Sequence, residues 1–220
     1  MDDSEFIREY DIREHKIWTM EEEKRGRVIQ AALQEFSKGF AAANTDAIVN
    51  EAGISKGLLF HYFGSKRGLF LFLLKYGLNV GFAEYAKVIS ENCDCIENIR
   101  IVSEHAWRLF VKYPLVFGFL AKAQSSINAV FPEGLPRDMP SSPHMLARYI
   151  CQRSNNDPSR FKEGVDAERA QNIIVWTLNG LSESCLMKYG DDVASYKKRF
   201  EEIAREQEEY LGMLRKMLYR

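Results

Sequence analysis

Apolar side chains recur every three to four residues along most of the chain, which is the spacing that gathers them on one face of an α-helix. The first clear case runs from about residue 22 to Gly39, a natural stop for a helix. The same pattern predicts helices at about 65–90, 95–113, 143–153, 166–189 and 193–218, and a short apolar segment covers 115–123. No segment alternates apolar and polar positions as a strand does, so the sequence predicts an all-α protein.

Proline and glycine divide this helical pattern. Pro114 marks the end of one helix or the start of the next. Residues 131–143 are rich in proline, which predicts a surface loop. Residues 1–20 are polar, mixed in charge and weakly periodic, so we expect a flexible arm or a short accessory helix there.

One segment, residues 44–66, has the composition of two short helices joined by a tight turn. Asn44 or Thr45 can cap the first helix. Gly53 supplies the positive φ that such a turn needs, and Ser55 is a good cap for the second helix. The pattern is typical of a helix-turn-helix, in which the second helix enters the major groove of DNA by its N-terminal end.

Charge at first argues against this interpretation, because the formal net charge is −1 and DNA-binding proteins often carry a basic excess. The local distribution differs from the total. No acidic residue lies between Glu51 and Glu84, and that window holds the basic side chains Lys56, His61, Lys66, Arg67 and Lys75. A protein that is neutral overall can therefore present one positive face to phosphate.

The motif resembles the DNA-binding domain of the TetR-type repressor family. The resemblance rests on the run Ala52-Gly53-Ile54-Ser55-Lys56-Gly57 and on Leu59-Phe60-His61-Tyr62-Phe63 followed by Ser65-Lys66. It is strong over about residues 24–70 and extends across the rest as a pattern of helices. Phe60 stands where the family usually has tyrosine, and Arg67 and Gly68 replace a commonly acidic pair. We therefore expect a weaker helix cap and a more positive surface after Lys66.

The resemblance implies a set of DNA contacts, to which we add Leu58 from its place on the second helix: Thr45, Ser55, Lys56, Gly57, Leu58, Phe60, His61, Tyr62 and Lys66. Lys56 and Lys66 are predicted to bind phosphate, and Leu58 and His61 to meet base edges or the thymine methyl group. For Tyr62, packing within the small domain is the alternative, and for His61 the alternative is an ordinary surface histidine. Phe63 is expected only to pack.

The resemblance also implies a helical core domain that dimerises and binds a small effector. The expected division is an N-terminal arm over 1–20, a helix-turn-helix domain over 21–66 and an effector-binding and dimerisation domain over 67–220. A single helix-turn-helix reads only a few base pairs, so specificity normally needs two copies on a palindrome.

For the dimer we expect an intersubunit bundle formed by the helices at 166–189 and 193–218. Gly180 and Ser184 lie four residues apart and would let two helices approach closely. Packing of Gly180 inside one subunit stays open as an alternative.

Effector sites in helical bundles form between helices and are mostly apolar with a few polar groups. The candidate lining residues are Ser103, Trp107, Phe110, Phe117, Gln124, Trp176 and Asn179. Each of them can equally be an ordinary core residue. Their aromatic content favours a hydrophobic or aromatic effector. Such a ligand would shift the dimer towards an arrangement in which its two helix-turn-helix domains, the reading heads, are wrongly spaced for adjacent major grooves.

Catalytic and metal chemistry have little support in the sequence. No Ser-His-Asp order or carboxylate pair can be assembled, and the four cysteines, at 93, 95, 151 and 185, match no common zinc spacing. We expect reduced thiols, no metal, no cofactor and no enzymatic activity. No apolar run approaches the roughly 20 residues of a membrane span, and no apolar segment of a secretory signal follows the acidic first residues, so a soluble, cytoplasmic protein is expected.

The sequence thus predicts a DNA-binding transcriptional regulator, a repressor that binds a palindromic operator as a homodimer and is released by a small hydrophobic or aromatic effector. Two alternatives stay open. One is a helical dimeric interaction or ligand-binding module without sequence-specific DNA binding. The other, within the main interpretation, is an activator in place of a repressor.

Overall fold

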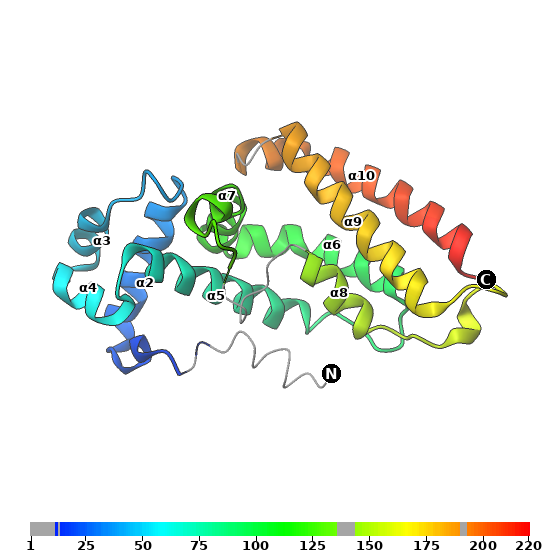
Figure 1. Cartoon of the computed structure of the whole chain (residues 1–220), viewed down its shortest axis with the longest axis horizontal. Coiled ribbons are helices and arrows are strands. Elements are labelled where there is room, and N and C mark those ends of the chain that lie inside the picture. Colours follow the sequence, from blue (N-terminus) through cyan, green and yellow to red (C-terminus); the bar gives the residue numbers. More distant parts are fainter. Residues whose placement is uncertain (1–11, 13, 136–143, 190–192) are drawn as a thin grey trace. The chain divides into compact units, whose positions relative to one another are not determined.

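The computed structural model describes residue 12 and residues 14–135, 144–189 and 193–220 (Figure 1). Regular structure in these residues is helical, apart from one isolated bridge between Phe161 and Tyr219. The predicted all-α class is therefore confirmed. The predicted loop at 131–143 is described only as far as residue 135, and its remainder lies outside the described residues.

The helices lie close to the segments that periodicity predicts. In chain order they are η1 (Lys16–Thr19), α2 (Glu22–Phe36), α3 (Thr45–Ala52), α4 (Lys56–Phe63), α5 (Lys66–Tyr85), α6 (Cys95–Lys112), α7 (Pro114–Val130), α8 (His144–Gln152), η2 (Pro158–Arg160), α9 (Ala167–Tyr189) and α10 (Val193–Leu218). Helix α7 extends beyond the apolar segment at 115–123 at both ends. Pro114 takes the first helical position, where its missing N–H costs nothing, and polar residues after Ala123 continue the helix at the surface.

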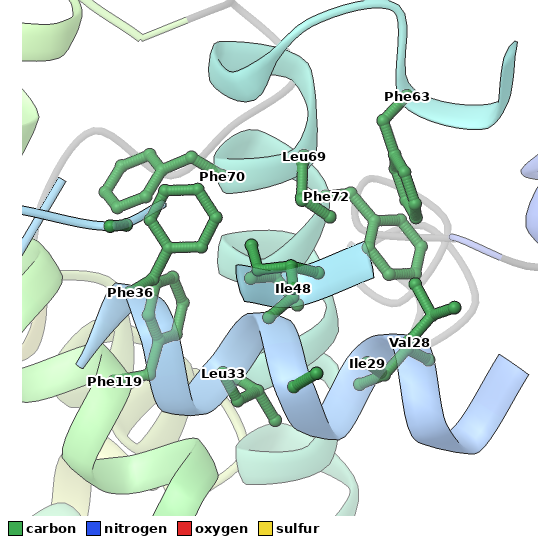
Figure 2. Packing of buried hydrophobic residues seen from close by; sticks show 14 of the residues in the cluster. Val28, Ile29, Leu33, Phe36, Ile48, Phe63, Leu69, Phe70, Phe72 and Phe119 are labelled. Atoms are coloured by element: carbon green, nitrogen blue, oxygen red, sulfur yellow. The ribbon is translucent and has the colours of Figure 1, made fainter. Parts of the chain in front are cut away.

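The chain packs as two compact units, and each is built from two separate segments of the sequence. The first unit contains residues 1–81 and 109–141, and the second contains residues 82–108 and 142–220. In the first unit α2 packs against α3 and α7. Phe36, Phe70 and Phe119 meet at its centre, with ring centroids 5.4 to 6.3 Å apart (Figure 2). This grouping describes packing, and the domain boundaries at residues 20 and 66 stay predictions.

Residues 14–20 pack onto the first unit. Ile17 is fully buried, and the ring of His15 stacks on Phe63 at 5.4 Å between centroids. Burial lowers the pKa of His15, and the charges of Lys16 and Lys75 lower it further. This stretch of the predicted arm is thus tied to the end of α4.

Helices α4 and α5 meet in a turn that has no space for a side chain at Gly68. A Cβ atom there would lie 2.1 Å from the carbonyl oxygen of Phe63. Oγ of Ser65 caps α5 by accepting a hydrogen bond from the N–H of Gly68 at 3.0 Å, and no acidic residue lies in the first turn. The expected weakness of this cap stays a prediction. The expected gain of positive surface is wrong at Arg67, whose guanidinium forms an ion pair with Glu133 and lies over the ring of Phe131.

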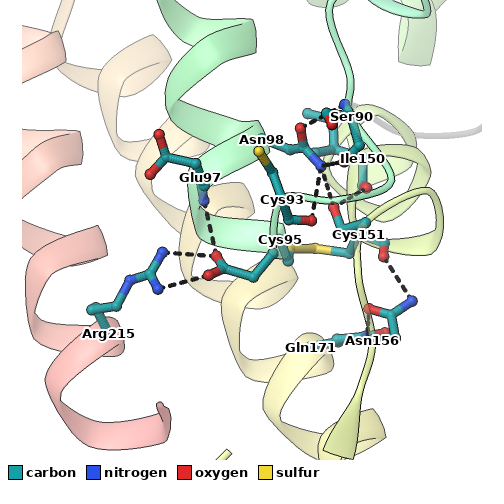
Figure 3. Close-up of a disulfide and its surroundings, with 12 residues drawn as sticks. Ser90, Cys93, Cys95, Glu97, Asn98, Ile150, Cys151, Asn156, Gln171 and Arg215 are labelled. Carbon is teal, nitrogen blue, oxygen red and sulfur yellow. Dashed lines mark hydrogen bonds and ion pairs between the residues drawn. A yellow bond between two sulfur atoms is a disulfide. The ribbon is translucent and has the colours of Figure 1, made fainter. Parts of the chain in front are cut away.

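The second unit contains residues 95–108 of α6 together with α8, α9 and α10, and α9 packs against both α8 and α10. A disulfide joins Cys95, the first residue of α6, to Cys151 near the end of α8 (Figure 3). The expectation of reduced thiols is therefore wrong for these two residues. Folding brings their Cα atoms to 4.6 Å although 56 positions separate them in the sequence. Cys93 and Cys185 are free.

Polar side chains surround this disulfide and are paired (Figure 3). Arg215 on α10 donates two hydrogen bonds of 2.7 Å to the buried carboxylate of Asp94. The fully buried amide of Asn98 donates to Oγ of Ser154 at 2.9 Å. Buried polar groups of this kind stabilise a fold only when they are satisfied, and here they hold the start of α6 to α8 and α10.

Two further findings apply to the described part of the chain. None of its helices is both long and apolar enough to cross a membrane. No three side chains of His, Cys, Asp or Glu in it lie together in a way that would hold a metal ion.

Candidate nucleic-acid interface and effector cavity

Local contacts define α3 and the turn that follows it. Oδ1 of Asn44 accepts a hydrogen bond from the N–H of Asp46 at 2.8 Å, which makes Asn44 the cap of the helix. At the other end Gly53 has a φ of +65°, a conformation that glycine adopts without strain. The N–H of Ile54 then donates to the carbonyl of Val49 at 3.0 Å. The predicted tight turn is confirmed, and it directs the chain into α4.

Helix α4 presents its N-terminal end and one side to solvent. Oγ of Ser55 accepts a hydrogen bond from the N–H of Leu58 at 3.2 Å, so the predicted cap is confirmed. Leu59 and Phe63 are buried on the opposite side. The predicted DNA contacts all keep exposed surface: Ser55, Lys56, Gly57 and His61 are exposed, and Thr45, Leu58, Phe60, Tyr62 and Lys66 are half-buried. They are thus available to a partner, whereas Phe63 packs as expected.

Lys56 is paired across the two helices of the motif. Its Nζ lies 2.8 Å from Oδ1 of Asp46 on α3, and both side chains are about half exposed. The acid-free window begins after Glu51 and therefore does not include Asp46, which tertiary folding brings to this surface. A phosphate that binds Lys56 competes with this carboxylate, so Asp46 belongs to the candidate site although sequence reasoning missed it.

The cation of Lys66 is held at the first residue of α5. Its Nζ lies 4.8 Å from the centre of the Phe40 ring and 3.5 Å from the carbonyl oxygen of Ala41. The N-terminus of a helix carries a partial positive charge from its unpaired N–H groups. Lys66 adds to this charge, which gives the start of α5 the electrostatic character of an anion site.

A cavity of about 480 Å³ lies entirely within the second unit, between α6, α8, α9 and α10. This volume falls in the range of small-molecule sites, roughly 300–1,000 Å³. Its walls are mainly aliphatic, with Ile99, Val102, Ala106, Leu146, Ala147, Ile150, Leu178, Leu181, Cys185, Phe200, Ile203, Ala204 and Leu211. The polar lining residues are Arg100, Ser103, Glu104, Asn179, Ser182, Gln207 and Glu208.

The predicted effector residues fall in different places. Ser103 and Asn179 line the cavity. The ring of Trp107 packs on the cavity residue Phe200, with 4.9 Å between centroids. Trp176 is 66% exposed on α9. The remaining candidates belong to the first unit: Phe110, Phe117 and Gln124. Sequence reasoning missed the aliphatic walls, because leucine and isoleucine at helical spacing look the same in a closed core as around a cavity.

Helices α9 and α10 lie side by side (Figure 1). Each of them carries an apolar stripe on its exposed surface. The stripes consist of Ile173, Trp176 and Met187 on α9 and Tyr210, Met213 and Met217 on α10, with exposed fractions from 40% to 86%. Gly180 and Ser184 are exposed on α9 too, and a Cβ at Gly180 would meet nothing within 4 Å. Packing of Gly180 inside the subunit, the alternative to an interface role, therefore finds no neighbour in the described residues.

A capped helix-turn-helix with an exposed second helix, in an all-helical chain, defines a helix-turn-helix transcription regulator. The model of the family described as "Bacterial regulatory proteins, tetR family" matches residues 28–73. The HTH-type transcriptional activator FasR of Mycolicibacterium smegmatis is 40% identical over 160 residues, which cover 70% of this chain and 67% of that protein. The chain belongs to the TetR family.

Solved structures share the fold over nearly the whole chain. A TetR family transcriptional regulator from Chloroflexus aurantiacus is 17% identical and matches 93% of this chain and 97% of its own, with a TM-score of 0.53. The fatty acid degradation regulator FadR from Bacillus halodurans is also 17% identical, and matches 91% of this chain and 99% of its own with a TM-score of 0.55. The predicted architecture, an N-terminal helix-turn-helix followed by a larger helical region, is confirmed at the level of the fold.

Proposed function

We propose that this TetR-family regulator is a repressor that binds a palindromic operator as a homodimer and leaves it when a small molecule fills the cavity of the second unit. The observation that carries the proposal is the surface of α4. Its N-terminal end is capped and exposed, and basic and hydroxyl side chains surround it without burial. These are the groups that bind phosphate oxygens and base edges when a recognition helix enters the major groove.

Replacing Lys56 with alanine tests the phosphate contact. The loss of one cation at the DNA surface should lower the slope of log affinity against log salt by about one, on every duplex sequence alike. Fluorescence anisotropy with a palindrome selected from random DNA, and with an unrelated duplex, measures both slopes. At low salt the drop in affinity should exceed that expected from losing one cation, because the change also leaves the carboxylate of Asp46 unpaired beside the phosphates.

Lys87 provides the matched control for this experiment. It is an exposed lysine in the second unit, paired with Glu84 at 3.0 Å much as Lys56 is paired with Asp46. Lys87→Ala should leave the salt slope unchanged. A wild-type slope in Lys56→Ala, or an equal fall in both variants, would remove Lys56 from the phosphate contacts.

A second copy of this chain is the partner that we propose for the stripes on α9 and α10. Two packed helices that each expose an apolar row form one half of a four-helix interface, and such a half buries its apolar surface when an identical half is added. Gly180 and Ser184 would lie where the helices of the two subunits come closest. Two reading heads joined in this way account for recognition of a palindrome.

Release by an effector requires that the ligand bind one arrangement of the dimer more tightly than the other. Helix α5 contributes residues to both packing units, since residues 66–81 belong to the first and the remainder to the second. We propose α5 as the element that transmits occupancy of the cavity to the helix-turn-helix. The mechanism is a shift in population towards a dimer whose reading heads no longer match adjacent major grooves.

An activator is the second candidate, because the relative from Mycolicibacterium smegmatis is named an activator. Transcription in vitro from a promoter that contains the selected palindrome separates the two. A repressor lowers the amount of transcript when it is added, and the effector restores it. A rise in transcript on addition of the protein would replace repression by activation and leave the DNA contacts as proposed.

A further inference from the structure

The polar groups around the cavity of the second unit differ in whether they already have partners. Oγ of Ser103 accepts a hydrogen bond from Nε2 of Gln207 at 2.6 Å. The hydroxyl of Ser182 donates to the carbonyl of Leu178 at 3.0 Å, within its own helix. Both hydroxyl groups thus already have one partner inside the protein and have less to gain from a ligand.

Asn179 is different. Its side chain lines the cavity and is only 6% exposed, yet its carboxamide makes no hydrogen bond within the described residues. A polar group that lines a cavity and has no partner in the protein gains a hydrogen bond when water or a ligand reaches it. The carboxamide offers two N–H donors and one carbonyl acceptor to a molecule in the cavity.

The charged groups at the cavity are carboxylates in excess of cations. Arg100 is bound by Glu208, at 2.5 and 2.8 Å, and also lies 3.6 Å from Glu97. The carboxylate of Glu104 adds a further negative charge to the lining. An anionic ligand would therefore meet a cation that is already neutralised and carboxylates that repel it.

The free thiol of Cys185 lines the same cavity and lies near further carboxylates. Burial raises the pKa of Cys185, and the charge of Glu206 raises it further. Lys188 opposes this effect, while Glu202 adds to it. The carboxylates around this end of the cavity therefore disfavour negative charge, in agreement with the pairing of Arg100.

From this arrangement we infer that the cavity selects an uncharged amphipathic molecule, whose apolar body packs on the aliphatic walls and whose carbonyl, hydroxyl or amide group pairs with Asn179. The inference rests on the proposed function and narrows its effector from hydrophobic in general to neutral and hydrogen-bonding. Asn179 is the residue that determines this specificity. Carboxylates and phosphates of the same size are rejected, because burying a charge without a counter-charge is costly.

Competition between octanamide and octanoate tests the inference, because the two share an apolar chain and differ in charge and hydrogen-bonding group. Full-length protein is loaded with the neutral fluorescent probe N-phenyl-1-naphthylamine, and each competitor is titrated at pH 7.5. We expect octanamide to displace the probe at a concentration at least about tenfold lower than octanoate. Equal or better displacement by octanoate would overturn the inference.

Three variants test which residues cause the preference for octanamide over octanoate. Asn179→Leu keeps the volume and removes the amide, so octanamide should bind about five- to tenfold more weakly while octanoate is unchanged. Gln171→Leu is the control on the same helix, since it also removes an amide. Gln171 does not line the cavity and its amide already donates to Asn156, so this variant should behave as wild type. Glu208→Gln removes the closer of the two carboxylates that pair with Arg100, so octanoate should bind several-fold more tightly. A wild-type preference for octanamide in Asn179→Leu would show that Asn179 does not set the specificity.

The outcome separates the ligand inference from the proposed function. Should octanamide displace the probe as described while the protein binds no DNA, the repressor proposal fails and the cavity chemistry stands. The protein could also bind its selected palindrome while neither competitor displaces the probe. That result would overturn the ligand inference and leave the repressor proposal standing.

Discussion

Gly68→Ala is expected to lower the free energy of unfolding by about 3 kcal/mol or more, and to weaken DNA binding with it. The added Cβ would lie 2.1 Å from the carbonyl oxygen of Phe63, and a backbone atom cannot swing aside as a side chain can. Relief requires the end of α4 to move away from the start of α5. Because α4 is the proposed recognition helix, this shift also displaces Lys56 and His61. Chemical denaturation followed by circular dichroism measures the loss of stability.

Gly26→Ala is the matched control, since Gly26 also lies within a helix of the first unit but a Cβ there would meet nothing within 4 Å. Alanine at an open helical position removes the conformational entropy cost of glycine, so this variant should be more stable by up to about 1 kcal/mol. Opposite signs in the two variants would show that the effect comes from the approach of Phe63. A Gly68→Ala protein as stable as Gly26→Ala would contradict the packing at this turn.

Gly68 also shows what the sequence could predict. The resemblance marks Arg67 and Gly68 as departures from the family pattern, but from it we predicted only an effect on surface charge and on the helix cap. The structure gives each a different role, with Arg67 bound to Glu133 and Gly68 seated against a carbonyl oxygen. Available space depends on how α4 and α5 meet, and this geometry is not visible in a pattern of residue types.

Local signals predicted the parts of the molecule that depend on neighbours in sequence. The caps at Asn44 and Ser55 and the turn at Gly53 involve residues at most five positions apart, so periodicity and capping preferences identified them. Contacts between distant segments were missed. The disulfide joins residues 56 positions apart, and the aliphatic walls of the cavity come from four helices. Only Ser103 and Asn179 among the predicted effector residues line it, since position on a helix does not reveal which face meets an empty space.

Trp176→Glu is expected to raise the dissociation constant of the proposed homodimer at least about 100-fold, which corresponds to about 2.7 kcal/mol. The ring is 66% exposed in one subunit and lies in the middle of the apolar stripe on α9. Burying a tryptophan there stabilises the dimer, whereas a buried glutamate would carry an unpaired charge into the interface. Analytical ultracentrifugation measures the dimer. The selected palindrome should no longer be bound at concentrations that saturate with wild type, because one reading head has too few contacts.

Val111 distinguishes loss of the interface from a general effect of placing a charge on an apolar surface. It is 65% exposed, almost as much as Trp176, but it belongs to the first packing unit, whereas α9 and α10 belong to the second. Val111→Glu should remain dimeric and bind DNA as wild type does. Met213→Glu, on the stripe of α10, should resemble Trp176→Glu. If Val111→Glu alone dissociates the dimer, the subunits meet through the first unit, and the spacing of the reading heads would then be set without α9 and α10.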